Sequence, residues 1–162
     1  MNTEPIQPLL ETTRQFAHPR CVVCGRDHGC GLDLRFSLCE DGSVEAGFAC
    51  GAQYEGYAGV LHGGIISALL DGAMTHCLFA RGLVAVTAEM TVRFRHPIVV
   101  DVPALVRAHV ADCQAPLHVL NALIVQEGRL KAKAVGKFVE RTMLEQKPDS
   151  VCRHMWDVRR SD

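Results

Sequence analysis

The sequence predicts an α+β protein in which one antiparallel β-sheet covers a single long, buried helix. Residues 63–81 carry apolar side chains around nearly the whole helical circumference, and a helix of that kind is buried. Two short runs of alternating apolar and polar residues precede this helix and four follow it, which is typical of antiparallel strands joined by short turns. The chain of 162 residues is long enough for one domain with its own core.

The elements before the buried helix are predicted to be a short helix and a β-hairpin. Residues 9–16 can form two helical turns. Residues 31–39 and 43–48 each alternate apolar and polar side chains, so each is expected to be a half-buried strand. Asp41-Gly42 lies between them and is a tight-turn signal. Residues 51–62 follow no simple period and are expected to form a loop.

The buried helix and the strands after it follow a clearer pattern. The helix over 63–81 is expected to end before Gly82, because glycine is common just after a helix C-terminus. Strands are then expected over 86–95, 104–112, 118–126 and 130–141. The predicted organisation is an N-terminal extension (1–20), one domain (21–142) and a polar C-terminal tail (143–162).

Composition excludes several classes of function. The net charge is −1 and no basic stripe is present, so we expect no nucleic-acid partner. No apolar run approaches the roughly 18–20 residues of a membrane span, and the start has no secretory-signal pattern. Several of the eight cysteines lie within apolar patterns, where free cysteine packs as a small hydrophobe. A reducing cytoplasmic location is therefore expected.

The segment His62-Gly63-Gly64, directly before the buried helix, is the strongest local signal of chemistry. Glycine lets the backbone approach a ligand closely, and the first N–H groups of a helix have no partner within it. Together with the positive end of the helix dipole, they can stabilise negative charge that develops on an oxygen. The alternative is that the glycines only turn the chain tightly against the sheet.

Asp71 is the second signal, because it is the only carboxylate between Gly63 and Arg81. Burying a carboxylate is costly unless it is paired or functional. The structural alternative is a core aspartate paired with Arg93 or Arg95. Asp71 lies eight residues past Gly63, which is roughly 12 Å along a helix, so one helix cannot bring both groups to one carbonyl. A second, antiparallel copy of the helix across a two-fold axis would, which predicts a homodimer.

The run Gly59-Val-Leu-His-Gly-Gly-Ile-Ile-Ser-Ala-Leu-Leu-Asp71 resembles the signature of the hotdog-fold thioesterases of the PaaI-like group. Residues 87–94 resemble the next strand of that family, and Cys21-Val-Val-Cys24-Gly25 resembles the opening of one of its branches. The resemblance covers roughly residues 21–141. It implies a sheet wrapped around a helix and the hydrolysis of acyl-CoA thioesters by a homodimer, with a dimer of dimers as a further possibility. It implies no metal or redox cofactor.

The resemblance also implies a role for each matching residue. Asp71 corresponds to the carboxylate that acts as base or nucleophile, and the Gly63 N–H to the donor that polarises the thioester carbonyl. His62 helps to position that carbonyl, and Thr87 matches a hydroxyl that orients water. We expect substrate contacts from Tyr54, Tyr57, Leu61, Gly64, Met74, Arg93 and Arg95, with Lys131, Lys133 and Lys137 as further candidates for the CoA phosphates. Two positions depart from the family pattern: Gly56 replaces a polar amide, and the turn over 113–118 lacks a Gly-Arg pair.

Three other interpretations compete. Cys21, Cys24, His28 and Cys30 could ligate zinc, but their spacing is shorter than in common zinc modules, which favours a cysteine-rich loop packed on the domain. Asp71 and His76 have the spacing of a hotdog hydratase, yet five residues rotate the side chain by about 140° around a helix, so the two would not converge. A non-catalytic acyl-CoA binding protein is the third, although a binder has no need of Asp71. The remaining histidines, His18 among them, are scattered and show no pattern.

Overall fold

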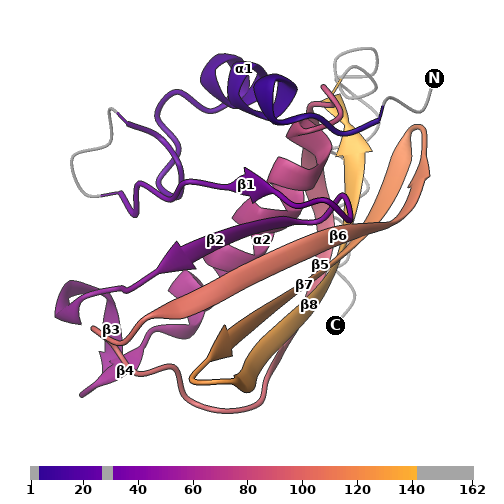
Figure 1. Ribbon diagram of the computed structural model, residues 1–162. Coiled ribbons are helices and arrows are strands. Elements are labelled where there is room, and N and C mark those ends of the chain that lie inside the picture. Colours follow the sequence, from indigo (N-terminus) through magenta and orange to yellow (C-terminus); the bar gives the residue numbers. More distant parts are fainter. Residues whose placement is uncertain (1–3, 27–30, 142–162) are drawn as a thin grey trace, which may run out of the picture.

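The computed structural model describes residues 4–26 and 31–141, and it contains one curved six-stranded sheet around a central helix (Figure 1). The predicted tail lies outside the described residues. The helical elements are α1 (Gln7–Ala17), the short 3₁₀ helix η1 (Ala52–Tyr54) and α2 (Gly63–Phe79). The strands are β1 (Ser37–Leu38), β2 (Val44–Phe48), β3 (Glu55–Tyr57), β4 (Val60–Leu61), β5 (Ala85–Phe94), β6 (Ala104–Gln114), β7 (Leu117–Gln126) and β8 (Arg129–Glu140).

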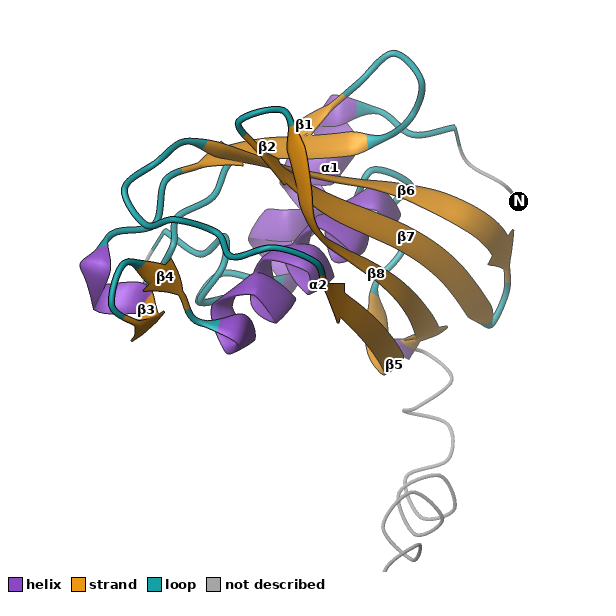
Figure 2. Ribbon diagram, turned by 90° about the horizontal axis from the view of Figure 1, so that it is seen from below, coloured by secondary structure: helices purple, strands orange, loops and turns teal. Residues whose placement is uncertain are grey.

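The six-stranded sheet is antiparallel throughout and has the order β1-β2-β6-β7-β8-β5. Figure 2 shows that the sheet curves over α2, with β5 at one edge and β1 at the other. This is the hotdog arrangement that the sequence predicts, and the fold prediction is confirmed. The four predicted strands after α2 are all present, with bounds shifted by no more than a few residues.

Helix α2 is buried because the sheet wraps around its apolar side chains. Its later turns are covered, including Leu69, Met74 and Leu78. Its first turn is different, since Gly63 and Gly64 are exposed. The helix ends close to the predicted position, and Gly82 adopts a φ of +71° just beyond it. The N-terminal end of α2 is therefore the open end, where a ligand can approach.

Residues 31–36 alternate as predicted but do not form a strand of the sheet. Leu34 and Phe36 are buried while Arg35 is exposed, so the period-two pattern correctly gives the buried side. The backbone, however, bonds to the preceding loop: the N–H of Leu32 donates to the carbonyl of Val22 at 2.7 Å, and that of Leu34 to Val23 at 2.8 Å. The predicted hairpin is therefore reduced to two residue pairs between β1 and β2.

The prediction of a plain loop over 51–62 is wrong. The segment forms η1 followed by a small ribbon, in which β3 pairs antiparallel with β4. The ribbon is anchored near α2 because the N–H of His62 donates to the carbonyl of Tyr54 at 2.9 Å. Strands of two and three residues are too short for an alternating pattern to show in the sequence.

Helix α1, predicted over 9–16, packs against α2. Arg14 and Leu10 are buried, and the N–H of Ile6 donates to the carbonyl of Ala80 at 2.9 Å. The N-terminal extension therefore covers part of α2 that the sheet leaves open (Figure 1).

In the part of the chain that the structure describes, no helix combines the length and apolarity needed to cross a membrane.

Candidate active site

The first turn of α2 presents one unpaired backbone donor. His62 caps the helix: its Nδ1 accepts the N–H of Gly64 at 2.9 Å, and its carbonyl accepts the N–H groups of Ile65 and Ile66. Of the first four helical N–H groups, only that of Gly63 has no hydrogen-bond partner among the described residues. This donor is solvent-exposed at the positive end of a 17-residue helix, which is where an oxyanion is stabilised.

The ring of His62 needs two glycines around it. A Cβ on Gly64 would lie 3.0 Å from His62 Nδ1, and a Cβ on Gly56 would lie 3.2 Å from His62 Cδ2. Both distances are tighter than ordinary van der Waals contact. Gly56, which departs from the family pattern, therefore leaves room for the capping histidine, and the sequence alone gave no reason for it.

Asp71 lies in the middle of α2, half-buried, and its partner is a hydroxyl. Thr87 Oγ1 in β5 donates to Asp71 Oδ1 at 2.5 Å. None of the ion pairs among the described residues includes Asp71, so the alternative of a core aspartate paired with Arg93 or Arg95 lacks its ion pair. Burial raises the pKa of Asp71, and the Thr87 hydrogen bond opposes that rise. The carboxylate is thus a stronger base than an exposed aspartate.

One protomer does not bring Asp71 and Gly63 together. Both lie on α2, eight residues and roughly 12 Å apart along its axis. The strand beside them, β5, has β8 as its only neighbour among the described strands, and it exposes apolar side chains. Val86 is 42% and Phe94 is 57% exposed. Phe94 lies beside Gly63, because a Cβ on that glycine would be 3.7 Å from its ring.

The predicted substrate-binding residues are distributed over different environments. Leu61, in β4 of the ribbon, is buried, and Met74 lies in the core against Gly136 of β8. Tyr57 is 83% exposed on β3. Tyr54 lines a cavity, which is described below.

The basic candidates for the CoA phosphates also differ. Arg93 and Arg95 are exposed at the end of β5 and form no ion pair with another described residue. Lys137 Nζ is paired with Glu89 at 2.9 Å, and Lys131 is buried. Lys133 is also exposed and forms no ion pair with another described residue, so it and the two arginines are the more available of these cations.

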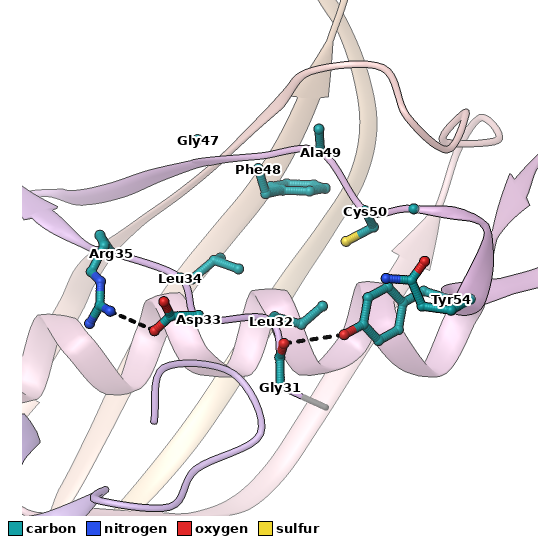
Figure 3. Close-up of a pocket in the computed structure, with 12 residues that line it drawn as sticks. Gly31, Leu32, Asp33, Leu34, Arg35, Gly47, Phe48, Ala49, Cys50 and Tyr54 are labelled. Carbon is teal, nitrogen blue, oxygen red and sulfur yellow. Dashed lines mark hydrogen bonds and ion pairs between the residues drawn. The ribbon is translucent and has the colours of Figure 1, made fainter. Parts of the chain in front are cut away.

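A cavity of about 410 Å³ opens between residues 31–35 and 47–54 (Figure 3). The side chains of Leu34, Phe48 and Cys50 lie between the two segments. Tyr54 closes one end, where its hydroxyl donates to the carbonyl of Gly31 at 3.2 Å. Its backbone carbonyl accepts the N–H of His62, so this end of the cavity adjoins the first turn of α2.

An ion pair between Arg35 and Asp33, 2.6 Å apart, borders the same cavity (Figure 3). Sequence reasoning found only Tyr54 of the lining. It missed the rest because the cavity is formed by contact between two segments that are distant in the sequence.

His76 belongs to the core. It is fully buried, its Nδ1 lies 2.7 Å from the carbonyl oxygen of Gly72, and its ring stacks on Phe36 with centroids 4.0 Å apart. Burial lowers the pKa of His76 to about 4, so the ring is neutral. Asp71 bonds instead toward β5, and the pair required for a hydratase is not formed.

Comparison with known proteins shows what this chain is similar to. The family model of the Thioesterase superfamily matches residues 58–133. A search of curated proteins found no match. A thioesterase superfamily protein of known structure aligns with a TM-score of 0.70 and 21% identity, covering 74% of this chain and 63% of that one, which is less than two thirds of its length.

Two bacterial structures are also similar. The phenylacetic acid degradation protein PaaI from Thermus thermophilus, solved as a mutant, has a TM-score of 0.61 and 24% identity, over 67% of this chain and 93% of that chain. A hypothetical thioesterase from Streptococcus pneumoniae, solved with coenzyme A, has a TM-score of 0.63 and 19% identity, over 67% and 88%. It was also solved as two variants, which replace an aspartate and a threonine, 16 positions apart, by alanine.

Proposed function

Because the chain resembles the PaaI-like thioesterases of the hotdog fold, we propose that it hydrolyses acyl-CoA thioesters to a free acid and CoA. The observation that carries the proposal is that a half-buried carboxylate, Asp71, pairs with the hydroxyl of Thr87 in β5 and lies on the same helix as the free Gly63 N–H. Thioester hydrolysis needs a donor for the developing oxyanion and a base or nucleophile. Both groups are present.

The Gly63 N–H supplies the donor. As the thioester carbonyl is attacked, negative charge grows on its oxygen, and a fixed N–H at a helix N-terminus stabilises that charge without reorganising. His62 holds the turn in place through its cap on Gly64, so the direction of the Gly63 N–H is set before the substrate binds.

Asp71 of the facing subunit supplies the base, or attacks the carbonyl itself. Its raised pKa makes it a better proton acceptor, and Thr87 orients the carboxylate and the attacking water. The Streptococcus pneumoniae protein supports this assignment indirectly. The aspartate and threonine replaced in its variants are 16 positions apart, as are Asp71 and Thr87.

The site therefore requires a homodimer. An exposed ten-residue edge strand such as β5 is a template for pairing with another chain. Joining two β5 edges across a two-fold axis would set the two α2 helices beside each other, cover Val86 and Phe94, and place Asp71 near the partner's Gly63. Two such dimers can associate further, but the site does not need a tetramer. We expect the dimer to work in the cytoplasm, where its cysteines stay reduced.

The cavity closed by Tyr54 is the proposed place for the acyl group. It adjoins His62, and its wall offers the apolar side chains of Leu34, Phe48 and Cys50 beside polar ones, including Asp33 and Arg35. Arg93 and Arg95, at the exposed end of β5, are the proposed contacts for the CoA phosphates. At the edge of the site, the exposed Tyr57 and Gly64 contact the substrate. The buried Leu61 and Met74 support the site by packing beneath it.

The alternative function is acyl-CoA binding without catalysis. Only a hydrolase depends on the basicity of Asp71, so Asp71→Asn distinguishes the two. The substitution keeps the shape and can still accept the Thr87 hydrogen bond. We expect kcat to fall by about 10² or more, the usual scale for a positioned base, with acyl-CoA affinity retained.

The measurement is kcat on the best acyl-CoA from a panel, by thiol release, together with the Kd of a non-hydrolysable analogue. Asp112→Asn, at an exposed position of β6, is the matched control and should keep wild-type kcat. Unchanged turnover in Asp71→Asn would remove Asp71 from the mechanism. A wild type that binds but never releases thiol would favour the binding protein.

A further inference from the structure

Three metal-binding side chains meet at the start of the domain, away from the proposed hydrolytic groups. His18 follows α1, and Cys21 and Cys24 lie in the loop after it. One ligand atom from each lies within 4.8 Å of the other two. Cys24 Sγ and His18 Nδ1 are 3.9 Å apart. Among the described residues, this is the only group of three or more such side chains that could hold a metal ion.

These separations suit a tetrahedral zinc ion. Zinc binds thiolate sulfur at about 2.3 Å and imidazole nitrogen at about 2.0–2.1 Å, so two ligands of one tetrahedral ion are roughly 3.5–3.8 Å apart. The 3.9 Å between Cys24 Sγ and His18 Nδ1 is close to that distance, and small side-chain rotations would bring all three atoms to it. A Cys-x-x-Cys spacing is also the usual spacing of zinc-binding cysteine pairs.

The loop is built to hold the two sulfurs on one side. The N–H of Gly25 donates to the carbonyl of Cys21 at 2.8 Å and closes the turn, and the N–H of Val23 donates to Cys21 Sγ at 3.4 Å. A Cβ on Gly25 would lie 2.5 Å from the nitrogen of Cys21, so the turn requires glycine. A backbone donor to a ligand sulfur is the kind of surrounding hydrogen bond that orients metal ligands.

The ring of His18 has a contact outside the loop. The ring of His18 meets Phe79 of α2 edge to face, with centroids 4.9 Å apart. Arg14 of α1 donates to the carbonyl of Cys24 at 3.3 Å and is itself paired with Glu11. Zinc with two thiolates carries no net charge, so the site would leave no unbalanced charge in this buried region.

We propose that His18, Cys21 and Cys24 bind a structural zinc ion, with water in the fourth position. The ion takes no part in thioester hydrolysis. Its role is to fix the Cys21–Gly25 loop against α2. Val23 of this loop packs so closely on Gly72 that a Cβ there would lie 2.8 Å from the valine Cγ1. Because Gly72 follows Asp71, the ion supports the helix at the point where it carries the carboxylate.

A zinc site explains the three residues better than a redox pair does. Cys21 is partly exposed and Cys24 is buried, an arrangement that a redox pair could also have, but a redox pair has no use for the imidazole of His18 as a third donor. The sequence alone offered His28 and Cys30 as the other two ligands, and it favoured a packed loop because that spacing is shorter than in common zinc modules. Both lie outside the described residues, and His18, from the end of α1, is the donor that the sequence pattern did not mark.

The test is the metal content of the full-length protein. We expect one zinc per chain after growth in zinc-containing medium, reduction and desalting. Cys21→Ser and His18→Asn, at partly exposed positions, should each lose most of it, whereas Cys113→Ser, at a cysteine on β6, should keep it. Cobalt(II) added to metal-free wild type should give the thiolate-to-cobalt absorption band, and Cys21→Ser should weaken it.

A second readout covers variants that fold poorly. Removing zinc with a chelator should lower the Tm of wild type and of Cys113→Ser, with little further effect on Cys21→Ser, because only the first two lose a bound ligand. A wild type that remains metal-free with added zinc(II) would overturn the proposal. So would equal zinc in wild type and Cys21→Ser, or a Cys21–Cys24 disulfide in freshly purified protein. Asp71→Asn should keep its zinc, which separates this site from the hydrolytic one.

Discussion

Two opposing effects act on the pKa of Asp71. Burial makes its ionised form less favourable, and the Thr87 hydroxyl, donating at 2.5 Å, makes that form more favourable. A general base works best when its pKa approaches the operating pH but still leaves it ionised. The hydroxyl therefore does more than orient the carboxylate, because it also limits how far burial raises the pKa of Asp71.

Thr87→Val should move the acid limb of the pH–rate profile to higher pH. The substitution keeps the side-chain volume and removes the hydrogen bond that lowers the pKa of Asp71, so that pKa rises further. At a pH of about 5 the variant should lose more activity than at a pH of about 8, and the plateau should fall by less than it does in Asp71→Asn. The measurement is kcat/KM from about pH 4 to pH 9.

Thr91→Val, on an exposed position of the same strand, is the control for that experiment. Its profile should match that of wild type. If Thr87→Val lowered the rate equally at every pH, the hydroxyl would orient water without adjusting the carboxylate.

The raised pKa of Asp71 also predicts how the stability of the fold depends on pH. The pKa of Asp71 is raised in the folded state, so protonation of Asp71 stabilises the fold. This contribution is fully present below the pKa of about 3.9 of an unfolded aspartate, and it is lost as the pH rises through the folded pKa. Asp71→Asn should therefore be more stable than wild type at neutral pH, by roughly 0.5–2 kcal/mol, the usual scale of one stabilising substitution.

Urea unfolding at pH 7 and pH 4 measures this difference, which should shrink at the lower pH. A core aspartate kept for its structure would give the opposite result, with Asp71→Asn less stable at pH 7. A gain in stability combined with a loss of turnover would mark Asp71 as a residue retained for function.

The helix and the long strands could be predicted from the sequence because each carries a strong local period. The apolar circumference of α2 defined its burial, and β5 to β8 appeared with nearly the expected bounds. Predictions of the weaker elements were wrong where tertiary contacts determine the structure. Residues 31–36 have the alternation of a strand, but Val22 and Val23 take their backbone hydrogen bonds, and no local pattern records which segment is the partner.

The candidate site was predictable in its residues but not in its contacts. The motif around Gly63 and Asp71 was visible, and so was Thr87. The cap of His62 on Gly64 and the space that Gly56 leaves for it were not, because they depend on the direction of one ring. The cavity and the position of His18 beside Cys24 were also hidden, since each joins separate segments.

The cavity between β2 and residues 31–35 predicts how acyl length is limited. Phe48 of β2 directs its ring into the space between the two segments (Figure 3). Phe48→Trp should fill part of the remaining space with the larger ring. For medium-chain or aromatic acyl-CoAs we expect kcat/KM to fall roughly tenfold or more, on the scale of a few methylene groups of lost contact.

Acetyl-CoA is the internal control, because a two-carbon acyl group does not need the cavity. The variant should hydrolyse it, if wild type does, at an unchanged rate, and its Tm should stay within a few degrees of wild type. Equal kcat/KM for long and short substrates in Phe48→Trp would place the acyl group elsewhere.

At the scale of the whole molecule, the proposed site is incomplete within one protomer, and the edge of the described sheet at β5 is unpaired at the same place. Strand β5 is the outer strand, carries Thr87 and Phe94, and lies beside the helix that carries Asp71 and Gly63. A second copy across a two-fold axis would cover the edge and complete the site in one step. Catalysis would then depend on residues from both subunits, and this can be tested without a structure of the dimer.

Mixing two inactive variants should restore activity if the site is shared. Gly63→Pro removes the proposed donor and little else: proline is favoured at the first helical position, and His62 already has the extended conformation, φ −62° and ψ 136°, that a following proline requires. Asp71→Asn removes the base. Each homodimer should be nearly inactive. A mixed dimer should contain one intact site, formed by Gly63 of the Asp71→Asn subunit and Asp71 of the Gly63→Pro subunit.

Random assortment of equal amounts makes half of the dimers mixed, each with one of two sites intact, so about a quarter of wild-type activity should return. Co-expression with two different tags allows the mixed dimer to be isolated, and its activity should be about half that of wild type. The control is the isolated dimer of one wild-type chain and one chain of the double variant Gly63→Pro/Asp71→Asn. One of its sites combines an intact Asp71 with the substituted position 63, and the other combines an intact Gly63 with the substituted position 71. Both sites are defective, so this dimer should be inactive. If each protomer held a complete site instead, the first mixture would stay inactive and the control would keep half of the activity, because both α2 groups would then act within one chain.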